Sequence, residues 1–119
     1  MKTIKLKVKN LNSNYTIIIG RNILNQISYQ IKTLCPGARK IAFIVDKNVP
    51  NKFEIKIKEY LKKYTVYTFK YSVNEKFKSF TNVNKLVEKC LSNNFNRNDV
   101  LISLGGGILG DYSAFAASI

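Results

Sequence analysis

The sequence has no histidine, only two cysteines and only 7 acidic residues among its 119. Without histidine there is no imidazole to activate a serine or cysteine nucleophile, so hydrolases of that kind are excluded. Cys35 and Cys90 lie far apart without a C-x-x-C spacing, and no histidine can complete a zinc site with them. We therefore expect no metal site on this chain and interpret both cysteines as packing residues.

The scarcity of acidic residues leaves 20 Lys and Arg and a net charge of +13. Such a positive potential attracts phosphates, nucleotides and nucleic acid without specificity. The basic residues are dispersed along the chain and form no tail or compact arm, which is typical of a solvated surface. A basic nucleic-acid-binding module is the alternative from a different functional class, because Tyr and Phe residues are interleaved with the lysines.

The amino terminus lacks a continuous hydrophobic segment. Its first ten residues, MKTIKLKVKN, alternate Lys with apolar residues, which is the pattern of neither a signal peptide nor a membrane span. We therefore expect a protein of the reducing cytoplasm.

Strand and helix patterns alternate along the chain, after two strands that indicate an amino-terminal β-hairpin. Strands are predicted at 4–8, 16–19, 41–45, 66–69 and 100–104, and helices at 22–34, 50–61, 83–91 and 112–119. This alternation predicts one α/β domain with a Rossmann-like, mostly parallel sheet flanked by helices, whose ligand crevice lies outside the carboxyl ends of the strands. The apolar helical run at 114–119 has no C-cap signal, so we interpret it as a truncation.

A glycine-rich turn follows the last predicted strand, with the sequence Gly105-Gly106-Gly107-Ile108-Leu109-Gly110-Asp111. Glycine lets the backbone approach a pyrophosphate without a Cβ in the way, and free N–H groups at a helix start bind its oxygens. The turn formally contains G-x-G-x-x-G, but the sequence has no acidic residue about 20 positions further on to bind a ribose. A tight turn without a ligand is the alternative interpretation.

Two further pairs of polar residues lie in predicted loops. Asp46 and Asn48 directly follow the central strand, where they could bind ribose hydroxyls, or where they could only cap the helix before Pro50. Glu75 and Lys78 flank a polar loop, where they could orient a nucleotide or form a solvated pair.

Taken in order, these landmarks resemble 3-dehydroquinate synthase, of the sugar-phosphate cyclase family. The resemblance covers essentially the whole chain and rests on the segments 15–21, 45–49, 75–79 and 99–111. Its most specific part is the triple glycine followed two residues later by Gly-Asp and then by Phe-Ala-Ala. The sequence departs from the family pattern at two places. Asn74 stands where the family has Gly, and Tyr112-Ser113-Ala114 replaces a pattern of Leu, a small residue and Gly. These departures could loosen the cofactor geometry without changing the fold.

The resemblance implies that residues 1–119 are an incomplete amino-terminal Rossmann-like domain that binds NAD. Carried over residue by residue, it places Asp46 and Asn48 near the adenosine ribose, Glu75 and Lys78 on a second cofactor-contacting loop, and Gly106, Gly107 and Asp111 at the pyrophosphate turn. The family's metal ligands and substrate-phosphate residues would all lie beyond residue 119, in a helical carboxy-terminal domain that holds a divalent metal, zinc or cobalt. The resemblance therefore assigns no catalytic residue and no metal ligand to this chain.

The implied activity is that of the whole family member, a phosphate-eliminating lyase of the shikimate pathway of aromatic amino acid biosynthesis. It converts 3-deoxy-D-arabino-heptulosonate 7-phosphate to 3-dehydroquinate, with NAD recycled in each turnover, and it is expected to be a homodimer without nucleic-acid or membrane partners. The 119 residues alone are expected to be inactive. The main alternative function is an iron- or zinc-dependent alcohol or glycerol dehydrogenase-like domain, but Glu75-x-x-Lys78-Ser79 and Gly110-Asp111 favour the synthase. Related sugar-phosphate cyclases share the same landmarks, so this part of the sequence does not distinguish them from the synthase.

Overall fold

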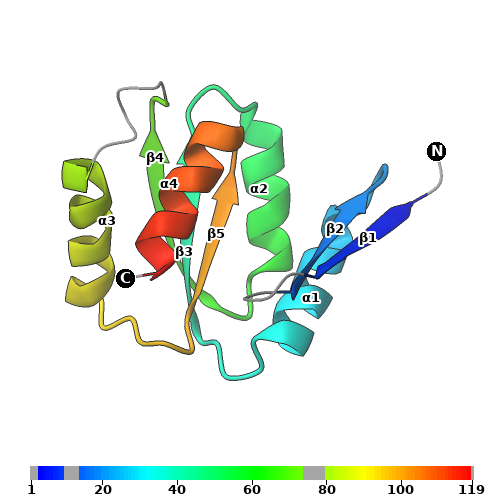
Figure 1. Cartoon of the computed structure of the whole chain (residues 1–119), viewed down its shortest axis with the longest axis horizontal. Helices are drawn as coiled ribbons and strands as arrows, with labels where there is room; N and C mark the ends of the chain where they lie inside the picture. Colours follow the sequence, from blue (N-terminus) through cyan, green and yellow to red (C-terminus); the bar gives the residue numbers. More distant parts are fainter. Residues whose placement is uncertain (1–2, 10–13, 74–79, 119) are drawn as a thin grey trace.

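A computed structural model of the chain describes residues 3–9, 14–73 and 80–118. It consists of a sheet with helices on both faces and a separate two-stranded hairpin that projects from them (Figure 1). None of the described helices is long and apolar enough to cross a membrane.

The sheet has three parallel strands in the order β4-β3-β5. Its strands are β3 (Lys40–Asp46), β4 (Thr65–Tyr71) and β5 (Val100–Leu104). The helices are α1 (Ile27–Leu34), preceded by a 3-10 turn at Leu24–Gln26, α2 (Asn51–Tyr60), α3 (Phe80–Ser92) and α4 (Gly107–Ser118). The hairpin pairs β1 (Ile4–Lys9) with β2 (Asn14–Ile19) in antiparallel fashion.

The core consists of two hydrophobic clusters, one on each side of β3. Ile41, Phe43 and Val45 of this strand pack against α1 and α2. Ala42 and Ile44 point to the opposite side and pack against α3 and α4. The prediction of a central strand covered on both faces is therefore confirmed.

The predicted α/β class, the parallel sheet and the amino-terminal hairpin are likewise confirmed. Two helices begin five residues away from their predicted starts: α1 begins at Ile27, after the 3-10 turn, rather than at Asn22, and α4 begins at Gly107 rather than at Tyr112. Glycine is unfavourable inside a helix, but a helix that begins at Gly107 places Leu109 and Tyr112 on one face. Both side chains are buried there, at most 1% exposed. Tertiary burial thus outweighs the local preference of the glycines.

Candidate functional site

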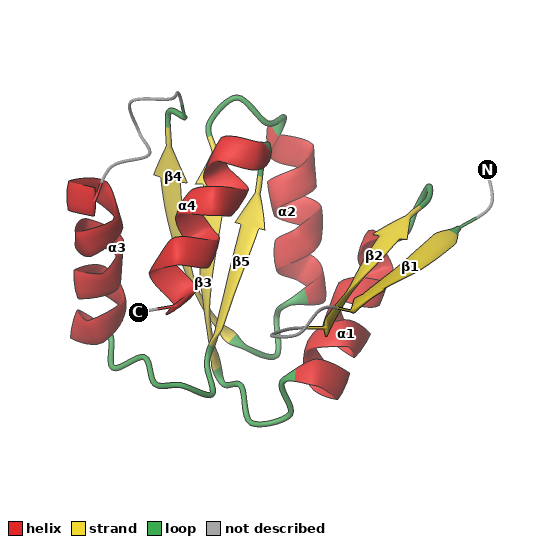
Figure 2. Ribbon diagram, in the orientation of Figure 1, coloured by secondary structure: helices red, strands yellow, loops and turns green. Residues whose placement is uncertain are grey.

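The carboxyl ends of β3 and β5 meet beside the starts of α2 and α4, as Figure 2 shows. The register that pairs Val45 with Leu104 brings Asp46 next to Gly105. A Cβ added at Gly105 would lie 3.1 Å from the Asp46 Cβ and 2.8 Å from Leu109 Cδ2. Gly105 is thus required by packing within the chain, and it lets the glycine turn lie directly against the end of the central strand.

The other glycines of the turn have open space around them. A Cβ added at Gly106, Gly107 or Gly110 would meet no atom within 4 Å. No glycine in the described part of the chain has a positive φ, so no backbone conformation there demands glycine. Neither turn geometry nor packing against the described residues explains these glycines, and the open space leaves room for a ligand to approach the backbone closely.

The start of α4 also presents backbone donors to this open space. The N–H of Gly110 donates to the carbonyl of Gly106 at 3.1 Å, which is the first hydrogen bond of the helix. The N–H groups that precede it, from Gly107 to Leu109, have no acceptor within the helix, and they carry the positive end of the helix dipole. The glycine backbone without side chains, the N–H groups without an acceptor in the helix and the positive end of the helix dipole together fit a pyrophosphate.

Asp46 and Asn48 lie at the same edge, and Asp46 already takes part in a turn. Its Oδ1 accepts the Asn48 N–H at 2.9 Å, and its carbonyl accepts the Val49 N–H at 3.1 Å. Among the described residues Oδ2 has no recorded partner, so the turn leaves one carboxylate oxygen for a hydroxyl of a ligand. The capping interpretation and the ribose interpretation of Asp46 are therefore compatible.

The remaining predicted site residues are Asp111, Glu75 and Lys78. Asp111 is exposed on α4, four positions after Gly107, and therefore on the same helix face as the turn. An ionised carboxylate only accepts hydrogen bonds, so Asp111 suits hydroxyl or amide donors rather than phosphate oxygens. Glu75 and Lys78 lie outside the described residues.

Tyr112 supports the site in a way that the sequence did not predict. Its side chain is 1% exposed, its hydroxyl donates to the Asn82 carbonyl at 2.8 Å, and its ring meets that of Tyr71 edge-on at 5.8 Å. Burial raises the pKa of Tyr112 above its usual value, so the hydroxyl stays a donor. Tyr112 therefore fixes the first turns of α4 against α3 and the end of β4. In the sequence, the three-residue spacing from Leu109 is the one signal that could have indicated a buried Tyr112.

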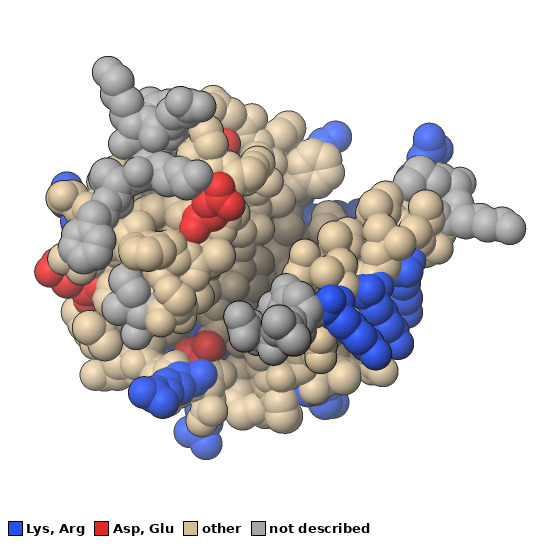
Figure 3. Space-filling view, in the orientation of Figure 1, with Lys and Arg blue, Asp and Glu red and all other residues tan. Residues whose placement is uncertain are grey.

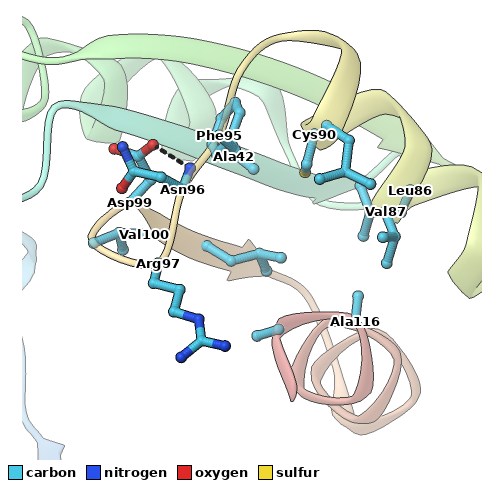
Figure 4. A pocket seen from close by; sticks show the side chains of 13 residues that line it. Ala42, Leu86, Val87, Cys90, Phe95, Asn96, Arg97, Asp99, Val100 and Ala116 are labelled. Carbon is cyan, nitrogen blue, oxygen red and sulfur yellow. Dashed lines mark hydrogen bonds between the residues drawn. The ribbon is translucent and has the colours of Figure 1, made fainter. Parts of the chain in front are cut away.

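A pocket of about 360 Å³ lies at the opposite end of the sheet, between α3 and α4 (Figure 4). Val100, Phe95 and Ala116 contribute to its largely apolar lining, and Arg97 lies at its open side. Ligands of parallel α/β sheets bind at the carboxyl edge, so this pocket is not the candidate site. Within the described residues, no three His, Cys, Asp or Glu side chains come together to hold a metal.

Comparison with known proteins shows what the whole chain is similar to. The family model for the amino-terminal part of 3-dehydroquinate synthase matches residues 68–119. The 3-dehydroquinate synthase of Pelagibacter ubique is 40% identical over 118 residues, which cover 99% of this chain and 32% of that protein. The chain is therefore similar to 3-dehydroquinate synthases over nearly its whole length.

Another 3-dehydroquinate synthase, from Bacillus cytotoxicus, is 29% identical over 95% of this chain and 31% of its own length. The chain thus spans about a third of the length of the relatives that it matches. The fold is also that of 2-deoxy-scyllo-inosose synthase, with a TM-score of 0.84 and 20% identity over 98% of this chain and 33% of that one. A second structure of that enzyme, complexed with carbaglucose-6-phosphate, NAD+ and Co2+, gives a TM-score of 0.80 at 19% identity, over 98% of this chain and 32% of that one.

Proposed function

We propose that this chain is the NAD-binding part of a 3-dehydroquinate synthase, which converts 3-deoxy-D-arabino-heptulosonate 7-phosphate to 3-dehydroquinate and phosphate in the shikimate pathway. The observation that carries the proposal is the glycine turn, where Gly106, Gly107 and Gly110 face open space beside unpaired N–H groups and Asp46. The similarity to 3-dehydroquinate synthases and the NAD+ complex of the fold neighbour support it.

In this proposal the backbone of Gly106 and Gly107 binds the pyrophosphate at the start of α4. Asp46, through Oδ2, and Asn48 bind hydroxyls of the adenosine ribose, while Asp111 accepts from a hydroxyl or amide donor. Glu75 and Lys78 belong to a second contact with the cofactor. NAD, when bound, supplies the reversible removal of hydride from a substrate hydroxyl.

The rest of the enzyme lies in the part of the family's length that this chain does not span. We assign to it the helical domain with the divalent metal, zinc or cobalt, and the substrate-phosphate contacts, so the 119 residues alone are inactive. The complete enzyme is a phosphate-eliminating carbon-oxygen lyase, and we infer a homodimer. The two cysteines of this chain, Cys35 and Cys90, form no disulfide with each other, which fits the proposed reducing cytoplasm.

Calorimetric titration of NAD into the complete polypeptide tests the proposed site. Gly106→Val places a branched side chain where the pyrophosphate must approach, and Asp46→Ala removes a ribose acceptor. Each is expected to weaken NAD binding at least about tenfold, equivalent to about 1.4 kcal/mol. Asp46→Asn keeps the acceptor that the turn uses and is expected to lose less affinity than Asp46→Ala.

Gly37→Val serves as the matched control, because Gly37 is an exposed glycine near Asn98, away from the carboxyl edge of the sheet. It is expected to leave the NAD affinity unchanged. Thermal unfolding of all variants verifies that they fold. Unchanged NAD affinity in folded Gly106→Val and Asp46→Ala proteins would contradict the proposed site.

A further inference from the structure

The glycine turn and α4 contain no side chain of positive charge. The sequence has no Lys or Arg after Arg97, and in Figure 3 the visible basic side chains lie away from α4. A phosphate at the start of α4 would therefore meet backbone N–H groups there, which cannot reach toward a ligand as a flexible lysine side chain does. The affinity of such a site depends on where the backbone of the turn is held.

The first residues of α4 have little helical preference of their own. Gly107 and Gly110 are two of the first four residues of the helix, and only proline is less favourable than glycine inside a helix. Contacts with the rest of the domain must therefore fix this part of α4. Leu109 and Tyr112 are its first two buried side chains, 0% and 1% exposed.

Tyr112 joins α4 to α3, which lies on the same face of the sheet (Figure 1). Its hydroxyl donates to the Asn82 carbonyl at 2.8 Å, across 30 positions of sequence. A carbonyl oxygen has two lone pairs, so Asn82 can accept this bond in addition to one within its own helix. Burial, and after it the neighbouring Tyr71, raises the pKa of Tyr112, so the hydroxyl keeps the proton that it donates. Because a hydrogen bond has a preferred length and direction, this one limits how far α4 can slide along α3.

The ring of Tyr112 connects the same helix to the strand ends that carry Asp46. It meets the Tyr71 ring edge-on, with 5.8 Å between the ring centres and 76° between the ring planes. Tyr71 is the last residue of β4 and the register partner of Asp46, and its carbonyl accepts the Lys47 N–H at 2.9 Å. A path of direct contacts therefore runs from the start of α4 through Tyr112 and Tyr71 to Asp46.

We propose that Tyr112 is a positioning residue for NAD: through Asn82 and Tyr71 it holds the glycine turn at the spacing from Asp46 that a bound dinucleotide requires. Tyr112 is 1% exposed, so it acts through the turn and not by touching the cofactor. The inference rests on the proposed NAD site, and it names a residue outside that site on which the affinity depends.

Calorimetric titration of NAD into variants of the complete polypeptide tests this role. Tyr112→Phe removes the hydroxyl and keeps the ring, and it is expected to raise the Kd for NAD about fivefold. Tyr71→Leu removes the ring that Tyr112 contacts and should also raise the Kd, so it serves as the second variant if Tyr112→Phe does not fold. Ile31→Val is the matched control, because it removes a buried methyl group from the cluster on the other side of the sheet. It should lower the Tm by a similar few degrees and leave the Kd for NAD unchanged.

A double-mutant cycle with Asp46→Ala separates positioning from a general loss of stability. If Tyr112 holds the turn relative to Asp46, Tyr112→Phe should matter less once the Asp46 carboxylate is gone. The two changes together should then weaken NAD binding by less than the product of their separate effects. In turnover, the KM for NAD should rise with the Kd, whereas kcat at saturating NAD should stay within about twofold of the unmodified enzyme.

Unchanged NAD affinity in folded Tyr112→Phe and Tyr71→Leu proteins would overturn the proposal, and so would simple multiplication of the Tyr112→Phe and Asp46→Ala effects. Gly106→Val distinguishes this failure from a failure of the proposed function. If Gly106→Val weakens NAD binding while Tyr112→Phe and Tyr71→Leu do not, the cofactor site stands without a role for Tyr112. If Gly106→Val also leaves the affinity unchanged, NAD does not bind at the turn and both proposals fail.

Discussion

Glu54 shows how a single acidic residue is held inside a basic protein. It is 7% exposed on α2, where spacing alone would have placed a solvated residue, and Phe53 beside it is instead 37% exposed. The Lys58 ammonium lies 2.7 Å from Oε2, and the Lys70 ammonium lies 2.7 Å from Oε1. Burial raises the pKa of Glu54, but these two ammonium groups outweigh it and hold the pKa below the usual 4.5. Glu54 thereby links α2 to β4.

The lowered pKa of Glu54 predicts how stability depends on pH. Well above pH 4.5 the residue is ionised in both the folded and the unfolded states, so its stabilisation is complete. Below that value the unfolded state binds the proton first, and the free energy of unfolding falls. Glu54→Gln should lower the free energy of unfolding by about 1–2 kcal/mol at neutral pH, a modest loss because both lysines are partly exposed. It should also make the free energy of unfolding fall less steeply as the pH is lowered below 4.5, the part of the pH profile that we call the acid limb.

Urea unfolding at a series of pH values measures both effects. Glu59→Gln, an exposed neutralisation on the same helix, is the control and should leave the pH profile as it is. Parallel acid limbs for Glu54→Gln and the unmodified protein would refute this account of Glu54.

At the scale of elements, Asp99 joins the start of the central strand to the loop before β5. Its Oδ1 accepts the backbone N–H groups of Lys40 at 3.0 Å and Arg39 at 3.3 Å, and its Oδ2 accepts that of Asn96 at 2.9 Å. Burial raises the pKa of Asp99, but these donors more than compensate and keep it below its usual value. One carboxylate therefore aligns the amino ends of β3 and β5.

Asp99→Ala is expected to lower the free energy of unfolding by about 2 kcal/mol, because it leaves backbone donors without their acceptor. Chemical denaturation monitored by circular dichroism measures the loss. Glu88→Ala, at an exposed position on α3, should change stability by less than about 0.5 kcal/mol. Equal stabilities of the two variants would mean that Asp99 does not connect these strands.

The existence of the elements could be predicted because their signals are local. The alternation of β1 and the apolar runs of β3 and β5 fall where the sequence predicted them, and Pro36-Gly37 ends the first helix region. Helix spacing was less reliable near helix ends: Leu34 and Leu91 fit their apolar faces but are 74% and 65% exposed. Burial there depends on which neighbours lie within reach, and spacing does not contain that information.

The candidate site also combines features that local sequence signals predict with features that depend on distant contacts. The position of the glycine turn and of Asp46 after strands could be predicted because the strand patterns before them are local, while their phosphate and ribose roles stay predictions. The packing of Gly105 against Asp46, and the bond from Tyr112 to Asn82, depend on sheet order and on contacts 30 or more positions apart. No local pattern carries such contacts, so only the structure could identify them.

At the scale of the whole molecule, the net charge of +13 sets a balance between folding and self-repulsion. Raising the NaCl concentration from about 20 to about 300 mM should raise the Tm by several degrees, because salt screens repulsion among dispersed lysines. Scanning calorimetry measures this shift. Replacing the exposed Lys62 and Lys63 by Gln should reduce it, and a Tm that falls with salt would show that attractive ion pairs dominate instead.

The alternating faces of β3 limit how the length of this segment can vary. A one-residue insertion or deletion within 40–46 would exchange its two sides, so that Phe43 would have to occupy the space of Ala42 or Ile44 beneath α3 and α4. The same shift would carry Asp46 away from Gly105. Insertions and deletions among relatives should therefore accumulate in surface loops such as 93–98, while the segment 40–46 keeps a constant length.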